Sequence, residues 1–309
     1  MRWPFGSFQH TVAYQISFSG YGVHSNCPVD MHVEPAPIGH GIEFICQFAN
    51  NKRIKVQPEN ISSKGYCTML HKDGVFIRTV EHFLAACIGM GIDNLKVTLS
   101  QEELPILDGS SLPFMLKFSA AKLKQAAPKR YFVLRRKLKV EDGQSLIQVS
   151  PAARMAMDCV IDYDHPWFRK NPELMKCKFD LDFDSFERIG IARTFGFLAD
   201  LPQLKKIGLG KGASMQNTVA FDDQRPVNPG GLRVKDECVA HKVLDLIGDL
   251  AVLGAPLIAH ITASRPGHRI NTQLVKEMVD QDLLVQVHAQ GDLKSHVAIG
   301  HAGLQEMME

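Results

Sequence analysis

Three short segments, far apart in the chain, carry residue types that could hold and use a catalytic metal ion. They are Thr79-Val80-Glu81-His82, His241-Lys242-Val243-Leu244-Asp245 and Gly267-His268. A catalytic zinc ion typically takes three imidazole or carboxylate ligands and keeps one position open for water. Hydrolysis at such an ion also needs a base for the water and an acid for the leaving group. The three segments supply a candidate for each role, which indicates metal-dependent hydrolysis.

The second segment lies in a proline-free run, 236–250, whose apolar residues recur every three to four positions. This periodicity predicts one helix. At about 100° per residue, His241, Asp245 and Asp249 fall on one stripe, with Lys242 at its edge. His241 and Asp245, at positions i and i+4, could therefore share a metal ion. An amphipathic helix with a solvated charged face gives the same pattern, so the helix alone leaves both interpretations open.

The first segment precedes an apolar run that also reads as a helix. Thr79 is a candidate N-cap, which would place Glu81 and His82 in the first turn. Neighbouring side chains on a helix point about 100° apart, so His82 could bind a metal while Glu81 acts on the bound water. The alternative is a glutamate that favours the helix dipole beside a surface histidine. His268 opens another helix-like stretch and could equally be a simple exposed histidine.

Further motifs occur between these segments, in an order and spacing that resemble one enzyme family. The chain is similar to the UDP-3-O-acyl-N-acetylglucosamine deacetylases, zinc amidases of lipid A biosynthesis in Gram-negative bacteria. Besides the three segments, the resemblance rests on Gly20-Tyr21-Gly22-Val23-His24-Ser25, Gly91-Ile92-Asp93-Asn94, Pro105-Ile106-Leu107-Asp108-Gly109-Ser110 and Ala192-Arg193-Thr194-Phe195-Gly196-Phe197. It extends from about residue 10 to about residue 285.

The resemblance implies a metal site and a general base. The implied ligands are His82, His241 and Asp245, and the implied base is Glu81. Zinc is the expected ion, and Fe²⁺ is the alternative for the same nitrogen and oxygen ligands.

The resemblance also implies groups for the leaving nitrogen and the carbonyl oxygen. His268, oriented by Asp249, would protonate the departing amine or steady the oxyanion. Lys242 and Thr194 would contact the carbonyl oxygen as negative charge grows on it. These roles agree with amide hydrolysis, which needs an activated water, a stabilised oxyanion and a proton for nitrogen.

The expected substrate is a UDP-linked, acylated amino sugar, whose N-acetyl group would be removed. Candidate substrate contacts are Phe195, Cys67 and His24, together with Lys242. The resemblance assigns a hydrophobic passage for the acyl chain to the segment 159–168. Ordinary core packing would explain the apolar residues of that segment, Phe195 and Cys67 equally well.

Three positions depart from the family pattern, and two other functions stay open. Asn26 stands where many members have glycine, Ala213 replaces the second glycine of a Gly-Gly-Ser element, and Gln216 replaces an acidic residue. The changes at 213 and 216 would permit a related metal amidase that acts on another N-acyl sugar. The other alternative is a non-catalytic protein that binds a sugar nucleotide or an acyl chain, which would not need an acid and a base.

Length and composition favour two globular domains. The chain has 309 residues, 45% of them hydrophobic and 22% charged. We place the boundary in 120–130, giving domains 1–126 and 127–309. Strands are expected at 95–99 and 131–140, the second followed by a turn at 141–143. The family fold implies two similar α+β domains that form a β-α-α-β sandwich, with the active site at their junction and an acyl-chain insert in the second.

Charge and cysteine content indicate a cytoplasmic enzyme. The net charge is only +2, so a broad nucleic-acid surface is not expected. The seven cysteines contain no Cys-x-x-Cys pair, which favours a reducing compartment over a disulfide framework. The chain shows no signal-peptide pattern and no apolar run of about 18 residues, so we expect at most peripheral membrane contact. We expect a monomer.

Overall fold

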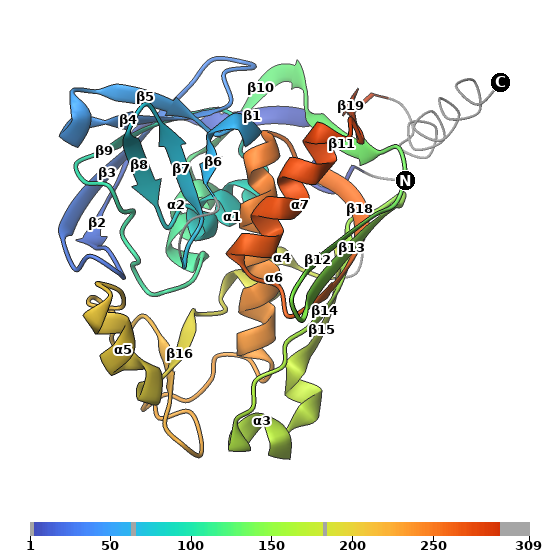
Figure 1. The fold of residues 1–309 in the computed structure, drawn as a ribbon. Coiled ribbons are helices and arrows are strands. Elements are labelled where there is room, and N and C mark those ends of the chain that lie inside the picture. The colour runs from blue at the N-terminus through green and yellow to red at the C-terminus, as the bar shows by residue number, and fades with distance from the viewer. Residues whose placement is uncertain (1–2, 63–65, 182–183, 291–309) are drawn as a thin grey trace.

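Two sheets enclose a layer of helices in the computed structural model, which describes residues 3–62, 66–181 and 184–290 (Figure 1). Strands dominate the left and right sides of the view, and the long helices lie between them. The molecule is therefore of mixed α and β structure, which confirms the predicted α+β class. Within the described ranges, no helix combines the length and apolar character needed to span a bilayer.

The first sheet is built from strands of the N-terminal half. Its order is β2 (Ile16–Tyr21), β3 (Pro28–Pro35), β9 (Leu95–Leu99), β4 (Ile42–Cys46) and β5 (Lys52–Lys55). Alternate residues of β9 are buried, as expected for a strand with one face on the core. The predicted strand at 95–99 is confirmed. A smaller sheet consists of β6 (Ile61–Ser62), β7 (Met69–Lys72) and β8 (Val75–Arg78).

The second sheet is built from strands of the C-terminal half. It contains β12 (Leu138–Asp142), β13 (Ser145–Pro151), β18 (Leu257–Ser264), β11 (Arg130–Leu134) and β19 (Leu284–His288). β14 (Ala156–Val160) also pairs with β18, and β15 (Lys176–Asp180) pairs with β14. The prediction of a single strand at 131–140 is wrong. The chain pairs with β18 and β19 up to residue 134 and then changes partner to β13, so two strands replace one.

The proposed domain boundary lies at a strand rather than in an open linker. β10 (Lys122–Pro128) pairs antiparallel with β1 (Phe8–Val12), so the chain between the two halves is hydrogen-bonded to its own N-terminal segment. The division at 126 and 127 stays a prediction.

The helices that position the candidate site lie between the two sheets. They are α1 (Glu81–Met90), α2 (Leu112–Ala121), α4 (Phe186–Gly190), α6 (Glu237–Leu250) and α7 (His268–Asp280). Short elements outside this layer are α3 (Pro166–Lys170), β16 (Phe195–Phe197), α5 (Leu201–Lys206) and β17 (Val219–Phe221). Further 3-10 turns occur at Gln47–Ala49, Pro58–Asn60, Pro172–Met175, Leu198–Asp200 and Ala251–Leu253.

The start of α1 differs from the prediction in one respect. Thr79 is not the N-cap, because Val80 occupies that position and no side chain caps the helix. The backbone φ of Thr79 is +58°, and its hydroxyl donates to Glu103 Oε1 at 3.2 Å. A β-branched residue in the left-handed region is strained, and such strain is often found beside functional residues. Glu81 and His82 nevertheless lie in the first turn, as predicted.

The polar stripe of α6 is buried, which rules out a solvated face. His241 is 1% exposed, Asp245 2% and Asp249 0%. α1 packs closely against this helix because Gly248 has no side chain. A Cβ atom at position 248 would lie 2.1 Å from the main-chain oxygen of Glu81. The glycine therefore lets the two helices approach at the height where their polar residues face one another.

We predict that Gly248→Ala separates α1 from α6. The added methyl group would meet main-chain atoms, which cannot move aside as a side chain could, so the expected loss of stability is about 1–3 kcal/mol. Urea unfolding measures this loss. Gly230→Ala is the matched control, since a Cβ there meets nothing within 4 Å. Equal stability of the two variants would contradict the proposed helix contact.

Candidate metal and proton-transfer site

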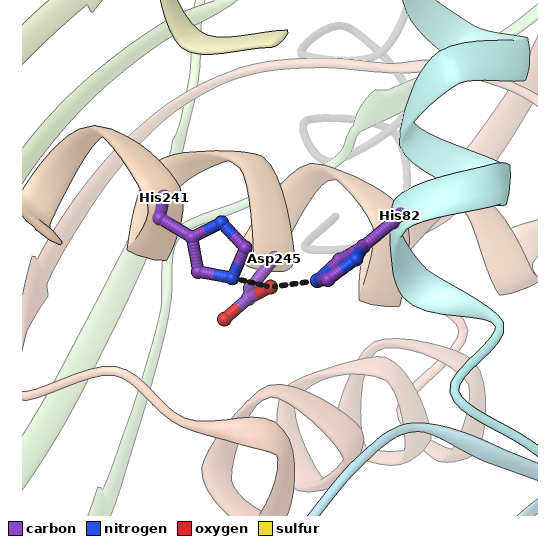
Figure 2. A group of neighbouring side chains, drawn as sticks. All are labelled: His82, His241 and Asp245. Carbon is purple, nitrogen blue, oxygen red and sulfur yellow. Dashed lines mark ion pairs between the residues drawn. The ribbon is translucent and has the colours of Figure 1, made fainter. Parts of the chain in front are cut away.

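His82, His241 and Asp245 converge between α1 and α6 (Figure 2). One ligand atom from each lies within 4.8 Å of the other two. Nε2 of His82 is 3.5 Å from Asp245 Oδ1, and Nε2 of His241 is 3.2 Å from the same oxygen. The structure thus brings together the three residues that the sequence suggested as metal ligands.

These side chains fit a divalent ion in their hydrogen bonding as well as in their distances. His241 Nδ1 lies 2.9 Å from the carbonyl oxygen of Ala192, which can only accept, so Nδ1 carries the hydrogen and Nε2 presents its lone pair. Burial lowers the pKa of His241 to about 3, which keeps the ring neutral. Within the described residues, Asp245 Oδ1 accepts no hydrogen bond although it is buried. A buried carboxylate oxygen without a donor is expected where a cation binds.

Lys242 places a positive charge beside Asp245. Its Nζ atom donates to Asp245 Oδ2 at 2.9 Å and lies 5.7 Å from the ring centre of Phe195. Burial opposes the charge of both groups, but attraction to neighbouring charges of opposite sign outweighs it. The pKa of Asp245 is therefore well below its usual value, and that of Lys242 is raised. Both groups are ionised, and the ammonium lies next to the three candidate metal ligands.

Glu81 is a buried carboxylate that faces the same cavity as His82, His241 and Asp245. It is 3% exposed, and burial raises its pKa despite the nearby imidazoles of His268 and His82. Its Oε2 accepts the main-chain N–H of Thr68 at 3.0 Å, and its Oε1 lies 3.9 Å from His268 Nε2. A carboxyl group with a raised pKa is a better proton acceptor, which suits a general base.

His268 stands opposite Glu81, at the first residue of α7. Its Nδ1 atom is 3.0 Å from Asp249 Oδ2. Burial disfavours the charged ring, but the Asp249 and Glu81 carboxylates outweigh this effect and raise the pKa of His268 to about 9. The ring is thus protonated near neutral pH and can donate from Nε2.

A cavity of about 440 Å³ opens beside these groups. Of the residues predicted from the sequence, it is lined by His24, Glu81, His82, Thr194, Phe195, His241, Lys242, Asp245 and His268. Asp249 is fully buried, and its Oδ2 atom contacts His268 Nδ1. Cys67 is also buried, and it does not line this cavity, so its contact with a substrate stays a prediction.

The apolar wall of the cavity comes from a different segment than expected. Residues between 195 and 220 line it, among them Leu198, Leu201, Leu204, Leu209 and Met215. Residues 159–168 are not among those that line the cavity, so the assignment of the acyl-chain passage to this segment stays a prediction. The segment supports the wall from outside, because the ring of Tyr163 lies 5.4 Å from the rings of Phe195 and Phe197.

Two of the three departures from the family pattern have a structural explanation. Asn26 has φ +56°, in the left-handed region that asparagine tolerates better than most residues. A Cβ at the retained Gly212 would lie 2.3 Å from the oxygen of Gly22, whereas Ala213 faces the cavity. The sequence therefore keeps glycine where the backbone contact requires it. Nothing in the structure explains Gln216.

Several residues of the site were not predicted from the sequence. Thr68 and Asn271 both donate hydrogen bonds to Asp249, and Glu103 accepts the main-chain N–H groups of His24 and Ser25 at 2.8 Å each. The spacing of Asn271, three residues after His268 in one helix, was the available signal.

A buried ion pair holds the main chain that leads to Thr194. Arg193 donates from Nε to Glu237 Oε1 at 2.8 Å, and its main-chain N–H donates to the same oxygen at 3.0 Å. This pair also fixes the neighbouring carbonyl group of Ala192, which accepts from His241. It therefore connects Thr194 in the cavity wall to His241, one of the candidate metal ligands.

The sequence matches known proteins over most of its length. The family model for UDP-3-O-acyl N-acetylglycosamine deacetylase matches residues 9–280. A UDP-3-O-acyl-N-acetylglucosamine deacetylase of Myxococcus xanthus is 40% identical over 302 residues, covering 96% of this chain and 94% of that protein. Proteins of the same name from Solibacter usitatus and Shewanella violacea are 38% and 36% identical, covering 94% and 89% of this chain and 97% and 90% of their own lengths. The chain thus belongs to the UDP-3-O-acyl N-acetylglycosamine deacetylase family.

Proposed function

We propose that this chain is a metal-dependent amidase that removes the N-acetyl group from UDP-3-O-acyl-N-acetylglucosamine, releasing acetate, in lipid A biosynthesis. The observation that carries the proposal is the convergence of His82, His241 and Asp245 beside the facing pair of Glu81 and His268. Relatives that cover nearly the whole chain carry the name of this activity.

His82, His241 and Asp245 would hold the ion, and Glu81 would act as the base. A bound divalent ion supplies Lewis acidity toward the amide carbonyl and toward a water molecule. The Glu81 carboxylate takes the proton from that water as the oxygen attacks the carbonyl carbon. Its main-chain partner, Thr68, keeps Oε2 occupied and leaves Oε1 directed toward His268.

Positive charge and a proton donor complete the reaction. The Lys242 ammonium lies on the cavity wall next to Asp245, where it stabilises negative charge on the carbonyl oxygen, with Thr194 on the same wall. The His268 imidazolium then donates its Nε2 proton to the nitrogen as the C–N bond breaks, because an amide anion is too basic to leave.

We also propose which residues contact the substrate, which ion is bound, and where and in what oligomeric state the protein acts. The apolar wall formed by residues of 195–220 would take the acyl chain, and His24 and Phe195 would contact the sugar nucleotide. We propose zinc as the native ion, with Fe²⁺ as the alternative for the same ligands. The seven cysteines form no disulfide, which supports a cytoplasmic protein. We propose that it acts as a monomer.

The decisive assay measures acetate release from UDP-3-O-acyl-N-acetylglucosamine and from UDP-N-acetylglucosamine, which lacks the ester chain. The apolar cavity should make the acylated substrate strongly preferred. Equal rates on both would favour a related amidase with another N-acyl sugar as its substrate. No release from either by the metal-loaded protein would contradict the proposal.

We predict that Glu81→Gln lowers kcat by a factor on the order of 100 or more while metal content is unchanged. The amide keeps the shape of the side chain and loses the ability to accept a proton. Steady-state acetate release and metal analysis together test this. Glu187→Gln, an exposed position in α4, is the control. A normal kcat in the Glu81→Gln variant would remove Glu81 from the mechanism.

We predict that His241→Ala loses most of its metal during dialysis, since one of three protein ligands is gone. Metal per protein is measured by mass spectrometry, which does not depend on activity. His288→Ala, on an exposed position of β19, should keep the wild-type content. Wild-type metal content in His241→Ala would exclude His241 as a ligand.

We predict that Asp249→Asn moves the alkaline limb of kcat/KM to lower pH. The reaction needs protonated His268, so the rate is present below the pKa of His268 and lost as the pH rises through it. The Asp249 carboxylate contributes to raising that pKa to about 9, and its removal must lower it. A pH series from about 5 to about 10 tests the shift. A limb that stays in place would contradict the role of the pair.

A further inference from the structure

One residue outside the predicted catalytic set contacts both proton-transfer groups. Thr68 is fully buried and precedes β7. Its main-chain N–H donates to Glu81 Oε2 at 3.0 Å, and its carbonyl oxygen accepts the N–H of Val80. Its hydroxyl donates to Asp249 Oδ1 and lies 3.1 Å from His268 Nδ1. Thr68 is therefore hydrogen-bonded both to Glu81, the proposed base, and to Asp249, the partner of the proposed acid His268.

The other oxygen of Asp249 is held in the same way. Asn271 is fully buried, and its Nδ2 atom donates to Asp249 Oδ2 at 2.7 Å. His268 Nδ1 lies 3.0 Å from that oxygen. Thr68 and Asn271 thus each hold one oxygen of the Asp249 carboxylate. The carboxylate can then orient only the Nδ1 edge of the His268 ring.

This arrangement decides which nitrogen of His268 faces the reaction. Nδ1 points to Asp249 and Thr68, so Nε2 points toward Glu81, 3.9 Å away. If the Thr68 hydroxyl is removed, Asp249 Oδ1 is left buried without that donor. A buried carboxylate oxygen that loses a donor is costly and turns toward another one, carrying the ring with it.

We propose that Thr68 is a positioning residue for the deacetylation, and this inference rests on the proposed function. Through its main chain it holds Glu81, and through its hydroxyl it holds the pair of Asp249 and His268. The base and the acid consequently face one gap at a fixed separation. Thr68 does not line the cavity, so it acts through these groups and not on the substrate.

The test compares Thr68→Val with Thr68→Ser. Valine keeps the shape and the main-chain N–H but removes the hydroxyl, whereas serine retains the hydroxyl. We expect Thr68→Val to lower kcat roughly 10- to 100-fold, in the range found for partners of active-site groups. KM and metal content should stay at the wild-type level because neither the cavity wall nor a metal ligand changes. Thr68→Ser should recover kcat to within about threefold of the wild type, since it restores the same donor.

The matched control is Thr272→Val. Thr272 is also buried, in α7, and its hydroxyl has no hydrogen-bond partner among the described residues. The same chemical change there should leave kcat unaltered. A kcat loss in Thr272→Val equal to that in Thr68→Val would overturn the proposal by showing a general packing effect.

Other results also decide the question. A normal kcat in Thr68→Val, or a rise in KM alone, would overturn the positioning role. Failure of serine to restore kcat would do the same. If Thr68→Val does not fold, Thr68→Ala removes the same hydroxyl without adding bulk and must show the same loss of kcat at constant KM. A metal-loaded wild-type protein without any deacetylation would instead overturn the proposed function, which distinguishes the two failures.

Discussion

The contact between α1 and α6 determines the geometry of the candidate site. His82 and Asp245 come from distant parts of the sequence, and they meet because Gly248 allows the main chain of Glu81 to lie against α6. The hydroxyl of Ser111 adds a second restraint, since it donates to the carbonyl oxygen of His82 at 2.6 Å. A shift of either helix would separate His82 from His241 and Asp245, even if the rest of the fold stayed unchanged.

Burial of so many polar groups is costly unless each has a partner, and the structure supplies the partners in two sets. Around Asp245, Lys242 donates to Oδ2, whereas Oδ1, which lies near Nε2 of His82 and of His241, has no donor among the described residues and is free for a cation. Around Asp249, one helical turn later, the partners are His268, Asn271 and Thr68. Two carboxylates on one stripe of α6 therefore take different roles, because their partners differ.

Many residues of the candidate site could be predicted from sequence, because helix periodicity and the motifs of the family resemblance specify them. The stripe of α6, the first turn of α1 and the strand at 95–99 all follow from short-range patterns. The predictions failed where contacts between residues far apart in the sequence determine the local structure. Thr79 donates to Glu103 instead of capping α1, and the run 131–140 changes partner strand. The part of the cavity wall that comes from 195–220 was likewise not expected from the sequence. Thr68 went unrecognised because its partners lie 13 and 181 residues away.

The central claim is that two imidazoles and one carboxylate bind a single divalent ion between α1 and α6. X-ray absorption spectroscopy at the metal edge of the purified protein tests this most directly. We expect a nitrogen and oxygen shell at roughly 2.0–2.2 Å, with the multiple scattering of two histidines and no sulfur. A sulfur shell at roughly 2.3 Å, or a spectrum without histidine scattering, would contradict it.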